Sequence, residues 1–371
     1  MSFEAFEKKI AKIQVRKICV IKPSAFGDVV QSLPILAAIK EAFPKATISW
    51  VINTGLASLI DDHPLIDEVI LFNRKDTFSG RKKLFNQLRE SKFDLVFDLQ
   101  GLLRTAIMSY ATAAPLRVGL KTAREGAHLA CHLIIPDTGK EVPAHRRYWK
   151  IAEAIGAGYL KSDSRINIPA QDKIWAQEQL KENKQYLAIQ AGARWETKRW
   201  PVDKFAVTAA KAYRLYGYIP VLVGSPDEQN VSDQFVNLCQ KFLPAQPLIN
   251  LTGKTTLKQL SAILEKSDIL LTNDSGPMHL AASLRTPVVG IFSCTCPEKS
   301  GPADATHRFV TTNLSCAASY RKRCPYSGKK HMACHEEIEI NRVWNALNQS
   351  IKIQQDSKND HQDNSPAEEA A

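Results

Sequence analysis

The sequence predicts an α/β protein made of two doubly wound parallel-sheet domains that face each other across a cleft. Short apolar runs alternate with helical patterns along the chain, which is typical of parallel βαβ units. The alternation stops at a polar segment near 161–172 and then begins again. The length, 371 residues, also exceeds what one hydrophobic core usually supports.

In the first half of the chain, four apolar runs are expected to be strands. Strands buried on both faces of a parallel sheet have nearly continuous apolar sequences, and these runs have that character. They lie at 17–21, 46–52, 68–72 and 93–98, and helical patterns lie at 29–39, 56–60, 80–91 and 102–112.

The second half repeats the pattern with five further strand-like runs. They lie at 186–190, 218–223, 248–251, 268–273 and 287–292. We therefore expect domains at 1–165 and 166–352. Residues 353–371 form a tail that from about Gln354 has no apolar residues except alanines, so it is expected to be disordered.

The amino-acid composition indicates in which cell compartment the protein works. No segment approaches the roughly 18 apolar residues of a membrane-spanning helix, and the first residues lack the apolar core of a signal peptide. We expect a cytoplasmic protein. Cys19, Cys131 and Cys239 lie in apolar or helical contexts that favour reduced, packed thiols.

The formal net charge of +11 calls for an anionic partner. The densest basic patch combines Arg74 and Lys75 with 81–83 and Arg89. An anionic small molecule, an anionic membrane surface and nucleic acid all fit this patch. Because no zinc-finger, helix-turn-helix or RNA-binding aromatic pattern accompanies it, nucleic acid ranks lowest.

The segment 22–28, Lys-Pro-Ser-Ala-Phe-Gly-Asp, is the first candidate site. It follows the strand 17–21 and precedes a helix, so Asp28 is expected at the carboxyl end of the first strand, where open α/β sheets bind ligands. Gly27 leaves room for a close approach to the backbone. The alternative is that Asp28 only caps the helix, because Asp is a favoured N-cap residue.

Two elements of the second half are candidate anion sites. In Asn-Asp-Ser-Gly-Pro-Met-His, residues 273–279, Ser275 and Gly276 are expected at a helix N-terminus that favours phosphate, with His279 one turn beyond. In the loop 191–201, Lys198 is a compact positive charge suited to a pyrophosphate. The alternatives are an ordinary capped helix and a solvated basic loop.

The cysteines near the C-terminal end could be metal ligands or packed thiols. Cys294, Cys296, Cys316, Cys324 and Cys334 lie here, with His331 and His335. Since no pair has Cys-x-x-Cys spacing, packed thiols or occasional disulfides in an exposed loop are favoured over structural zinc.

Taken together, these motifs resemble the bacterial lipopolysaccharide heptosyltransferases, the ninth glycosyltransferase family. The resemblance covers roughly 17–350 in the right order and is carried by 22–40, 93–106, 117–125, 197–201 and 272–292. It implies a GT-B arrangement of two Rossmann-like domains, the first binding the acceptor and the second the nucleotide sugar.

The resemblance also implies roles for individual residues. The family's catalytic base matches Asp28, and its nucleotide-phosphate lysine matches Lys198. The nucleotide-binding turn matches Asp274, Ser275, Gly276, Pro277 and His279, and acceptor-side basic residues match Arg81, Lys82, Arg104 and Arg124. A histidine contact of many members does not carry over, because its place is occupied by Pro143, with His145 nearby.

The expected activity is transfer of heptose from ADP-heptose, with inversion, to a hydroxyl of an anionic Kdo–lipid A inner core. No Asp-x-Asp pair occurs, so no cofactor or divalent cation is expected. The anionic glycolipid acceptor would bring the protein into peripheral contact with the cytoplasmic face of the inner membrane.

Three alternatives remain open. One is a family member that uses another nucleotide sugar or glycan acceptor. A nicotinamide-dependent oxidoreductase would share the α/β pattern, but the first strand is not followed by Gly-x-Gly-x-x-Gly. A nucleic-acid-binding protein would share the positive charge.

Overall fold

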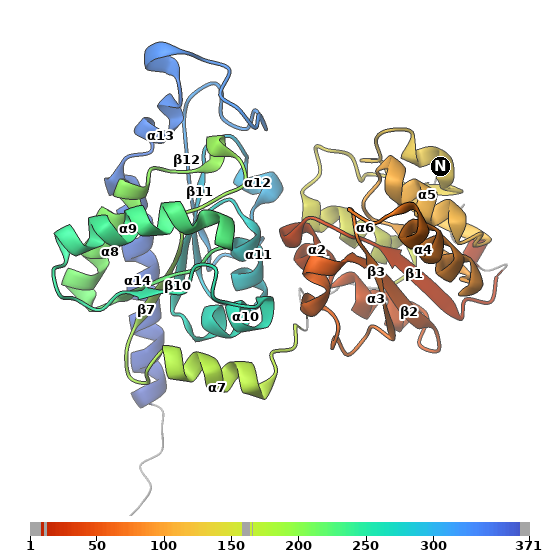
Figure 1. Ribbon diagram of the computed structural model, residues 1–371, viewed down its shortest axis with the longest axis horizontal. Coiled ribbons are helices and arrows are strands. Elements are labelled where there is room, and N and C mark those ends of the chain that lie inside the picture. The colour runs from red at the N-terminus through yellow and green to blue at the C-terminus, as the bar shows by residue number, and fades with distance from the viewer. Residues whose placement is uncertain (1–8, 11–12, 158–163, 165, 364–371) are drawn as a thin grey trace, which may run out of the picture. The chain divides into compact units, whose positions relative to one another are not determined.

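The computed structural model describes residues 9–10, 13–157, 164 and 166–363 (Figure 1). The chain divides into two compact units, Met1–Asn167 and Ile168–Ala371, so the division lies close to the predicted boundary at 165. Among the described residues, each unit contains one six-stranded sheet in which every pairing is parallel. The predicted pair of doubly wound domains is confirmed.

The first unit has the strand order β3-β2-β1-β4-β5-β6. Its strands are β1 (Lys17–Ile21), β2 (Thr47–Asn53), β3 (Glu68–Phe72), β4 (Leu95–Asp98), β5 (Leu116–Leu120) and β6 (Leu133–Ile135). Its helices are α2 (Phe26–Ser32), α3 (Ile35–Ala42), α4 (Phe78–Glu90), α5 (Leu103–Ala111) and α6 (Ala144–Ala154), with 3-10 turns η1 (Thr54–Leu59) and η2 (Ala127–Ala130).

The second unit has the order β12-β11-β10-β7-β8-β9. Its strands are β7 (Tyr186–Gln190), β8 (Ile219–Leu222), β9 (Ile249–Asn250), β10 (Ile269–Asn273), β11 (Val288–Phe292) and β12 (Arg308–Thr311). Its helices are α7 (Ala170–Gln179), α8 (Val202–Tyr216), α9 (Gln229–Phe242), α10 (Leu257–Lys266), α11 (Gly276–Ser283), α12 (Pro297–Ser300), α13 (Ala333–Glu337) and α14 (Ile340–Asp363), with 3-10 turns η3 (Glu196–Lys198), η4 (Pro226–Glu228) and η5 (Gly328–Lys330).

Several elements differ from the prediction. Strands β5, β6 and β12 were not expected from the sequence, because they are short and two of them carry an arginine. The predicted helix at 56–60 is the 3-10 turn η1. Helix α14 continues to Asp363, past residue 353 where the tail was expected to be disordered.

Helix α14 is held by apolar side chains on one face. Val343, Leu347 and Ile351 recur every four residues and are buried in the core of the second unit. Burial of each such side chain contributes about 1.5–3 kcal/mol. This anchored stretch is a nucleus from which the polar end of the helix extends, since propagation of a helix is far easier than its nucleation.

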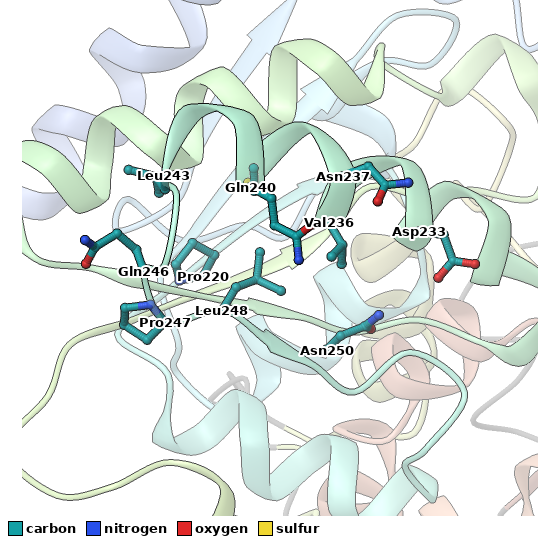
Figure 2. Close-up of a pocket in the computed structure, with 11 residues that line it drawn as sticks. Pro220, Asp233, Val236, Asn237, Gln240, Leu243, Gln246, Pro247, Leu248 and Asn250 are labelled. Atoms are coloured by element: carbon teal, nitrogen blue, oxygen red, sulfur yellow. The ribbon is translucent and has the colours of Figure 1, made fainter.

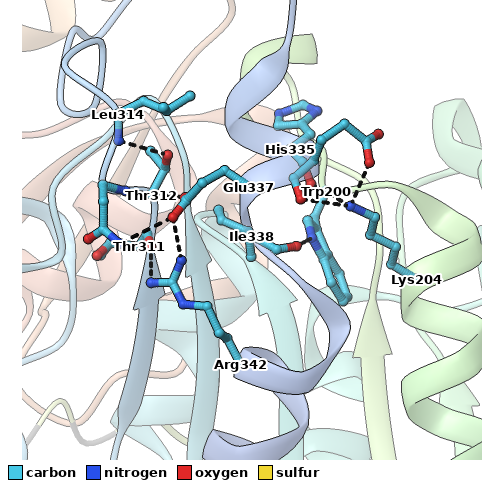
Figure 3. A network of polar contacts seen from close by, with 11 residues as sticks. Trp200, Lys204, Thr311, Thr312, Leu314, His335, Glu337, Ile338 and Arg342 are labelled. Atoms are coloured by element: carbon cyan, nitrogen blue, oxygen red, sulfur yellow. Dashed lines mark hydrogen bonds and ion pairs between the residues drawn. The ribbon is translucent and has the colours of Figure 1, made fainter.

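A polar network ties the chain after β12 to the rest of the second unit (Figure 3). Arg342 donates to the carbonyl of Thr311 at 2.6 Å and pairs with Glu337 at 2.8 Å. On the other side of α13, Trp200 Nε1 donates to the carbonyl of Ile338 at 2.9 Å, and Lys204 pairs with Glu336 at 3.0 Å. The network fixes α13 beside the start of α8.

Candidate active site

Both sheets have a switch point beside their first strand. In the first unit β1 pairs with β2 on one side and β4 on the other, and in the second β7 pairs with β8 and β10. Connections from the two central strands leave in opposite directions there, which opens a crevice at the carboxyl ends of the strands. In sheets of this kind, ligands bind at these two edges.

Asp28 lies in the first turn of α2, just beyond β1. Its Oδ2 accepts a hydrogen bond from the backbone N–H of Ala25 at 3.3 Å. Ala25 is the N-cap of α2 and Asp28 is its third residue, so Asp28 is not the N-cap of the alternative interpretation but makes the reciprocal contact of a capping box. The same oxygen lies 3.7 Å from Nζ of Lys22, and the Asp28 side chain is 44% exposed. One carboxylate therefore caps the helix and reaches solvent as well.

Lys22 is a buried cation behind Asp28, with a side chain only 5% exposed. Its Nζ donates to the carbonyl of Leu99 at 3.4 Å and lies 5.9 Å from the ring centroid of Tyr148 on α6. Burial lowers the pKa of Lys22, but Tyr148, Asp28 and Asp98 raise it, and the net direction is upward. Lys22 is charged at neutral pH. Lys22 was not predicted to be a site residue, although a lysine directly after a buried strand indicates a site.

Asp98 closes β4 and is also buried. It accepts hydrogen bonds from the backbone N–H groups of Gln100 and Gly101, each at 3.0 Å, and from Thr105 Oγ1 at 3.0 Å. Burial raises the pKa of Asp98, while these hydrogen bonds and Lys22 oppose the rise. The carboxylate thus fixes the turn that carries Arg104.

The four predicted acceptor-side residues fall into two groups. Arg104 lies in the first turn of α5, and the backbone N–H of Arg124 donates to the carbonyl of Gly101 at 2.8 Å, so the turns after β4 and β5 touch. Gly101 has φ +62°, and a Cβ there would lie 2.8 Å from Cα of Ala123. Arg81 and Lys82 lie exposed on α4, which follows edge strand β3.

In the second unit, Lys198 and Asp274 form an ion pair. Lys198 Nζ lies 2.6 Å from Asp274 Oδ2 and 4.7 Å from the ring centroid of Trp195. The Asp274 side chain is 6% exposed and that of Lys198 17%. Lys198 comes from η3 after β7, and Asp274 directly follows β10, so the pair lies at the switch point.

The loop that carries Lys198 is held by buried polar side chains. Asn273 donates from Nδ2 to the carbonyl of Ala191 at 2.7 Å and accepts from the backbone N–H of Trp200 at 3.0 Å. A Cβ on Gly192 would lie 1.9 Å from Glu228 Oε1, so a larger residue there would displace the Glu228 carboxylate. Neither Asn273 nor Glu228 was predicted to support the site. Asn273 could have been found from the sequence, because a polar residue at the end of a buried strand indicates a site.

The backbone carbonyl of Thr197, the residue before Lys198, accepts two hydrogen bonds from other elements of the second unit. One comes from Ser293 Oγ after β11, and the other from His335 Nε2 on α13 at 3.1 Å. Burial lowers the pKa of His335, so its imidazole is neutral at neutral pH and Nε2 carries the proton that this carbonyl accepts. The network of Figure 3 thereby supports the Lys198 loop.

The predicted phosphate-binding turn lies beside this ion pair. Ser275 is the N-cap of α11 in extended conformation, and Gly276 and Pro277 begin the helix. Ser275 Oγ lies 3.1 Å from Thr272 Oγ1, and His279 is buried within the helix. The first-turn N–H groups of α11 and the positive end of its dipole favour an anion.

The C-terminal cysteines hold no metal-type cluster in the part of the chain that the structure describes. Within it no three His, Cys, Asp or Glu side chains are placed to bind an ion together. All eight cysteines are free thiols, and Cys324 Sγ accepts from the backbone N–H of Met332 at 3.4 Å.

A separate cavity of about 510 Å³ lies between α9 and edge strand β9 (Figure 2). Val236, Leu243 and Leu248 line it, and none of the predicted site residues does. It belongs to the sheet edge rather than to the switch point.

Comparisons with known proteins agree with this architecture. The chain is 28% identical to the lipopolysaccharide core heptosyltransferase OpsX of Haemophilus influenzae, over 77% of this chain and 82% of the relative. Among solved structures it is similar to E. coli ADP-heptose LPS heptosyltransferase II, with TM-score 0.75, 22% identity and coverage of 91% and 99%. It is also similar to E. coli heptosyltransferase WaaC with ADP-2-deoxy-2-fluoro heptose, with TM-score 0.67, 20% identity and coverage of 91% and 99%.

The two Rossmann-like sheets with charged switch points fit a glycosyltransferase, and the family match shows that the chain is one. The family model for glycosyltransferase family 9 (heptosyltransferase) matches residues 81–330, and the chain belongs to this family.

Proposed function

We propose that this protein is an inverting, metal-independent heptosyltransferase. It moves heptose from ADP-heptose to a hydroxyl of an anionic lipopolysaccharide inner core, a Kdo–lipid A. The donor and acceptor classes are those in the names of similar proteins. The name of E. coli ADP-heptose LPS heptosyltransferase II includes the donor, and the name of lipopolysaccharide core heptosyltransferase OpsX includes the acceptor. The observation that carries the mechanism is the half-exposed carboxylate of Asp28 at the first switch point.

In the proposed reaction, Asp28 takes the proton of the acceptor hydroxyl as its oxygen attacks the anomeric carbon of the donor. The bond from that carbon to the pyrophosphate breaks on the opposite face, so the configuration inverts. Lys22 keeps the carboxylate ionised and oriented before the proton arrives. Asp28 is suited to this role because its carboxylate, held by the N–H of Ala25 and by Lys22, still reaches solvent.

Negative charge then develops on the leaving ADP. Lys198 and the N–H groups at Ser275 and Gly276 stabilise that charge in a largely buried setting, where electrostatic interactions are strong. With nucleotide bound, Asp274 holds Lys198 in place without exposing its own charge. A divalent cation is not needed in this scheme, because the lysine and the helix dipole supply the positive potential.

The acceptor carries carboxylates and phosphates, and Arg104 and Arg124 present positive charge on touching turns. Arg124→Ala should raise the KM for a soluble, truncated acceptor and leave the Kd for ADP unchanged. Lys45→Ala is the matched control, because Lys45 is exposed at the amino end of β2, away from the switch point. Equal KM values for Arg124→Ala and the parent would remove Arg124 from the acceptor site.

A donor panel tests the proposed function as a whole. ADP-heptose should be turned over with a soluble Kdo-containing acceptor, and UDP-, GDP- and other ADP-sugars should be poor donors. EDTA should leave the rate unchanged. Preference for another nucleotide sugar would identify a family member of different specificity, and strict dependence on Mg²⁺ or Mn²⁺ would overturn the metal-independent mechanism.

A further inference from the structure

The chain between β12 and α13 returns to the loop that follows β7. The hydroxyl of Thr197 in that loop donates to the carbonyl of Arg321 at 2.7 Å. The backbone N–H of Tyr320 donates to the carbonyl of Cys294, which follows β11, at 2.8 Å. These two hydrogen bonds hold residues 320–323 against the loops after β7 and β11, on the switch-point edge of the second sheet.

The side chain of Tyr320 lies near the ion pair of the second unit. Its hydroxyl is 3.1 Å from Oγ of Ser300 on α12. Burial is the main cause that raises the pKa of this phenol, and the negative charge of Asp274 raises it further. Asp274 is the carboxylate that pairs with Lys198. Residues 320–323 therefore border this ion pair.

The bordering loop is strongly basic. Residues 321–323, Arg-Lys-Arg, are all exposed, and no Asp or Glu occurs at 305–335. The neighbouring elements η3 and α12 each carry one exposed acid, Glu196 and Glu298. Neither of these carboxylates forms an ion pair with 321–323. The positive charge of the loop is thus not neutralised within the part of the chain that the structure describes.

Lys322 of this loop shares an aromatic ring with Lys198. Nζ of Lys198 lies 4.7 Å from the ring centroid of Trp195, and Nζ of Lys322 lies 5.8 Å from the same centroid. An ammonium at such a distance is attracted by the electron-rich face of an indole ring. Trp195 therefore brings ammonium groups from two different loops to one ring.

The ion pair of the second switch point carries no net charge by itself. Lys198 lies 2.6 Å from the buried carboxylate of Asp274, so the two charges cancel. The N-terminus of α11 adds only about half a positive charge. Because a nucleoside diphosphate has negative charge on both of its phosphates, the ion pair and the helix leave part of that charge uncompensated. Lys322 is a cation beside the pair that no carboxylate among the described residues neutralises.

We infer that Lys322 is a second cation for the diphosphate of the nucleotide donor, held over Trp195 beside the ion pair of Lys198 and Asp274. Lys198 and Lys322 then meet the phosphates from two loops, and the start of α11 meets them from a third. The inference deepens the proposed function and rests on it in one respect: this edge binds a nucleoside diphosphate sugar.

Calorimetric titration of ADP into the full chain tests the inference. Lys322→Met keeps the aliphatic stem beside the ring and removes the charge, so the Kd for ADP should rise roughly fivefold, the upper end for an exposed charge pair. Lys322→Arg should stay within about twofold of the parent, because a guanidinium also stacks on an indole ring and pairs with phosphate. The matched control is Lys329→Met, which removes an exposed lysine from η5 and should bind ADP like the parent.

A double-mutant cycle separates a positioned cation from a general effect of net charge. In a Trp195→Leu background, Lys322→Met should raise the Kd for ADP by less than about twofold, because the ammonium has already lost the ring that holds it. Urea unfolding of each variant shows that it is folded. An equally large effect in both backgrounds would overturn the inference, as would parent-like ADP binding by Lys322→Met or an equal loss in Lys329→Met.

The titration needs neither acceptor nor turnover, so it is independent of the test of the proposed function. GDP and UDP are titrated in parallel, because Lys322 is inferred to contact the phosphates and not the base. A parent that binds none of the three nucleotides overturns the inference. A parent that binds ADP through Lys322 but transfers no heptose from ADP-heptose contradicts the proposed function alone.

Discussion

The two switch points use the same pair of residue types with opposite burial. After β1, the lysine is buried and the aspartate reaches solvent, whereas after β7 and β10 the aspartate is buried and the lysine is the more exposed partner. The buried Lys22 is held by Asp28 and by the carbonyl of Leu99, and the buried Asp274 is held by Lys198. Without such partners a buried charge would be strongly destabilising. The more exposed partner is the one that a ligand in solvent can reach.

This difference teaches which chemistry each unit can support. An exposed carboxylate held next to a buried cation is ready to accept a proton, and an accessible ammonium held by a buried carboxylate is ready to meet an anion. Both sheets have an equivalent switch point at the carboxyl ends of their central strands. Whether the exposed group there is a carboxylate or an ammonium decides which chemistry that switch point can support. The following predictions test that contrast, from the largest effect to the smallest.

The largest effect is expected at Asp28. Asp28→Asn keeps a hydrogen-bond acceptor for the N–H of Ala25 but cannot take a proton, so turnover should fall by roughly 10²–10⁴. The Kd for ADP should not change, because the second unit is untouched. Single-turnover rates and ADP titration measure the two quantities, with Asp67→Asn as a control in the same unit. Turnover near that of the parent would leave Asp28 with helix capping alone.

Removal of the exposed cation in the other pair should be almost as damaging. Lys198→Ala should lower kcat by roughly 10²–10³ and weaken ADP binding, because the leaving pyrophosphate loses its positive partner. Rapid-quench kinetics and calorimetry separate the two effects. If ADP affinity and kcat both match those of the parent, the phosphate site lies elsewhere.

Lys22→Met should have an intermediate effect and a distinctive pH profile. Asp28 would lose its adjacent positive charge and hold a proton at higher pH, so the acid limb of kcat/KM should move to higher pH. Lys40→Met, which breaks the pair of Lys40 with Asp67 at 3.1 Å, is the matched control and should leave the profile in place. A uniform loss of rate without movement of the acid limb would assign Lys22 a purely structural role.

The smallest effect concerns the support of the Lys198 loop. Because burial lowers the pKa of His335, the unfolded chain binds its proton at higher pH than the folded protein does. His335 therefore contributes to a loss of stability as the pH falls below about 6.5, at no more than about 1.4 kcal/mol per pH unit. His335→Gln keeps a donor for the carbonyl of Thr197 and cannot titrate, so its unfolding free energy should depend less on pH between 7.5 and 5.5. Urea unfolding at several pH values measures this free energy. The prediction is wrong if the parent and His335→Gln show the same pH dependence.

Much of the fold was determined by sequence alone. Apolar runs such as 17–21 and 268–273 were predicted to be buried strands from their sequence, and the structure has β1 and β10 there, both inside their sheets. The motifs after them placed Asp28, Lys198 and the 273–279 turn at strand ends, where the structure has them. Local pattern is sufficient there, because strand, turn and helix start follow each other directly.

Tertiary structure alone decided which groups support these residues. Lys22 acquires its role from Tyr148 and Asp98, and the carbonyl of Thr197 acquires its donor from His335, across sequence separations that no local pattern reports. Burial was decided in the same way: both switch points have one lysine and one aspartate in sequence, and only packing shows which of the two is exposed. The physical reason is that desolvation and charge pairing depend on every element packed around a group, whereas hydrophobic periodicity depends only on its chain neighbours.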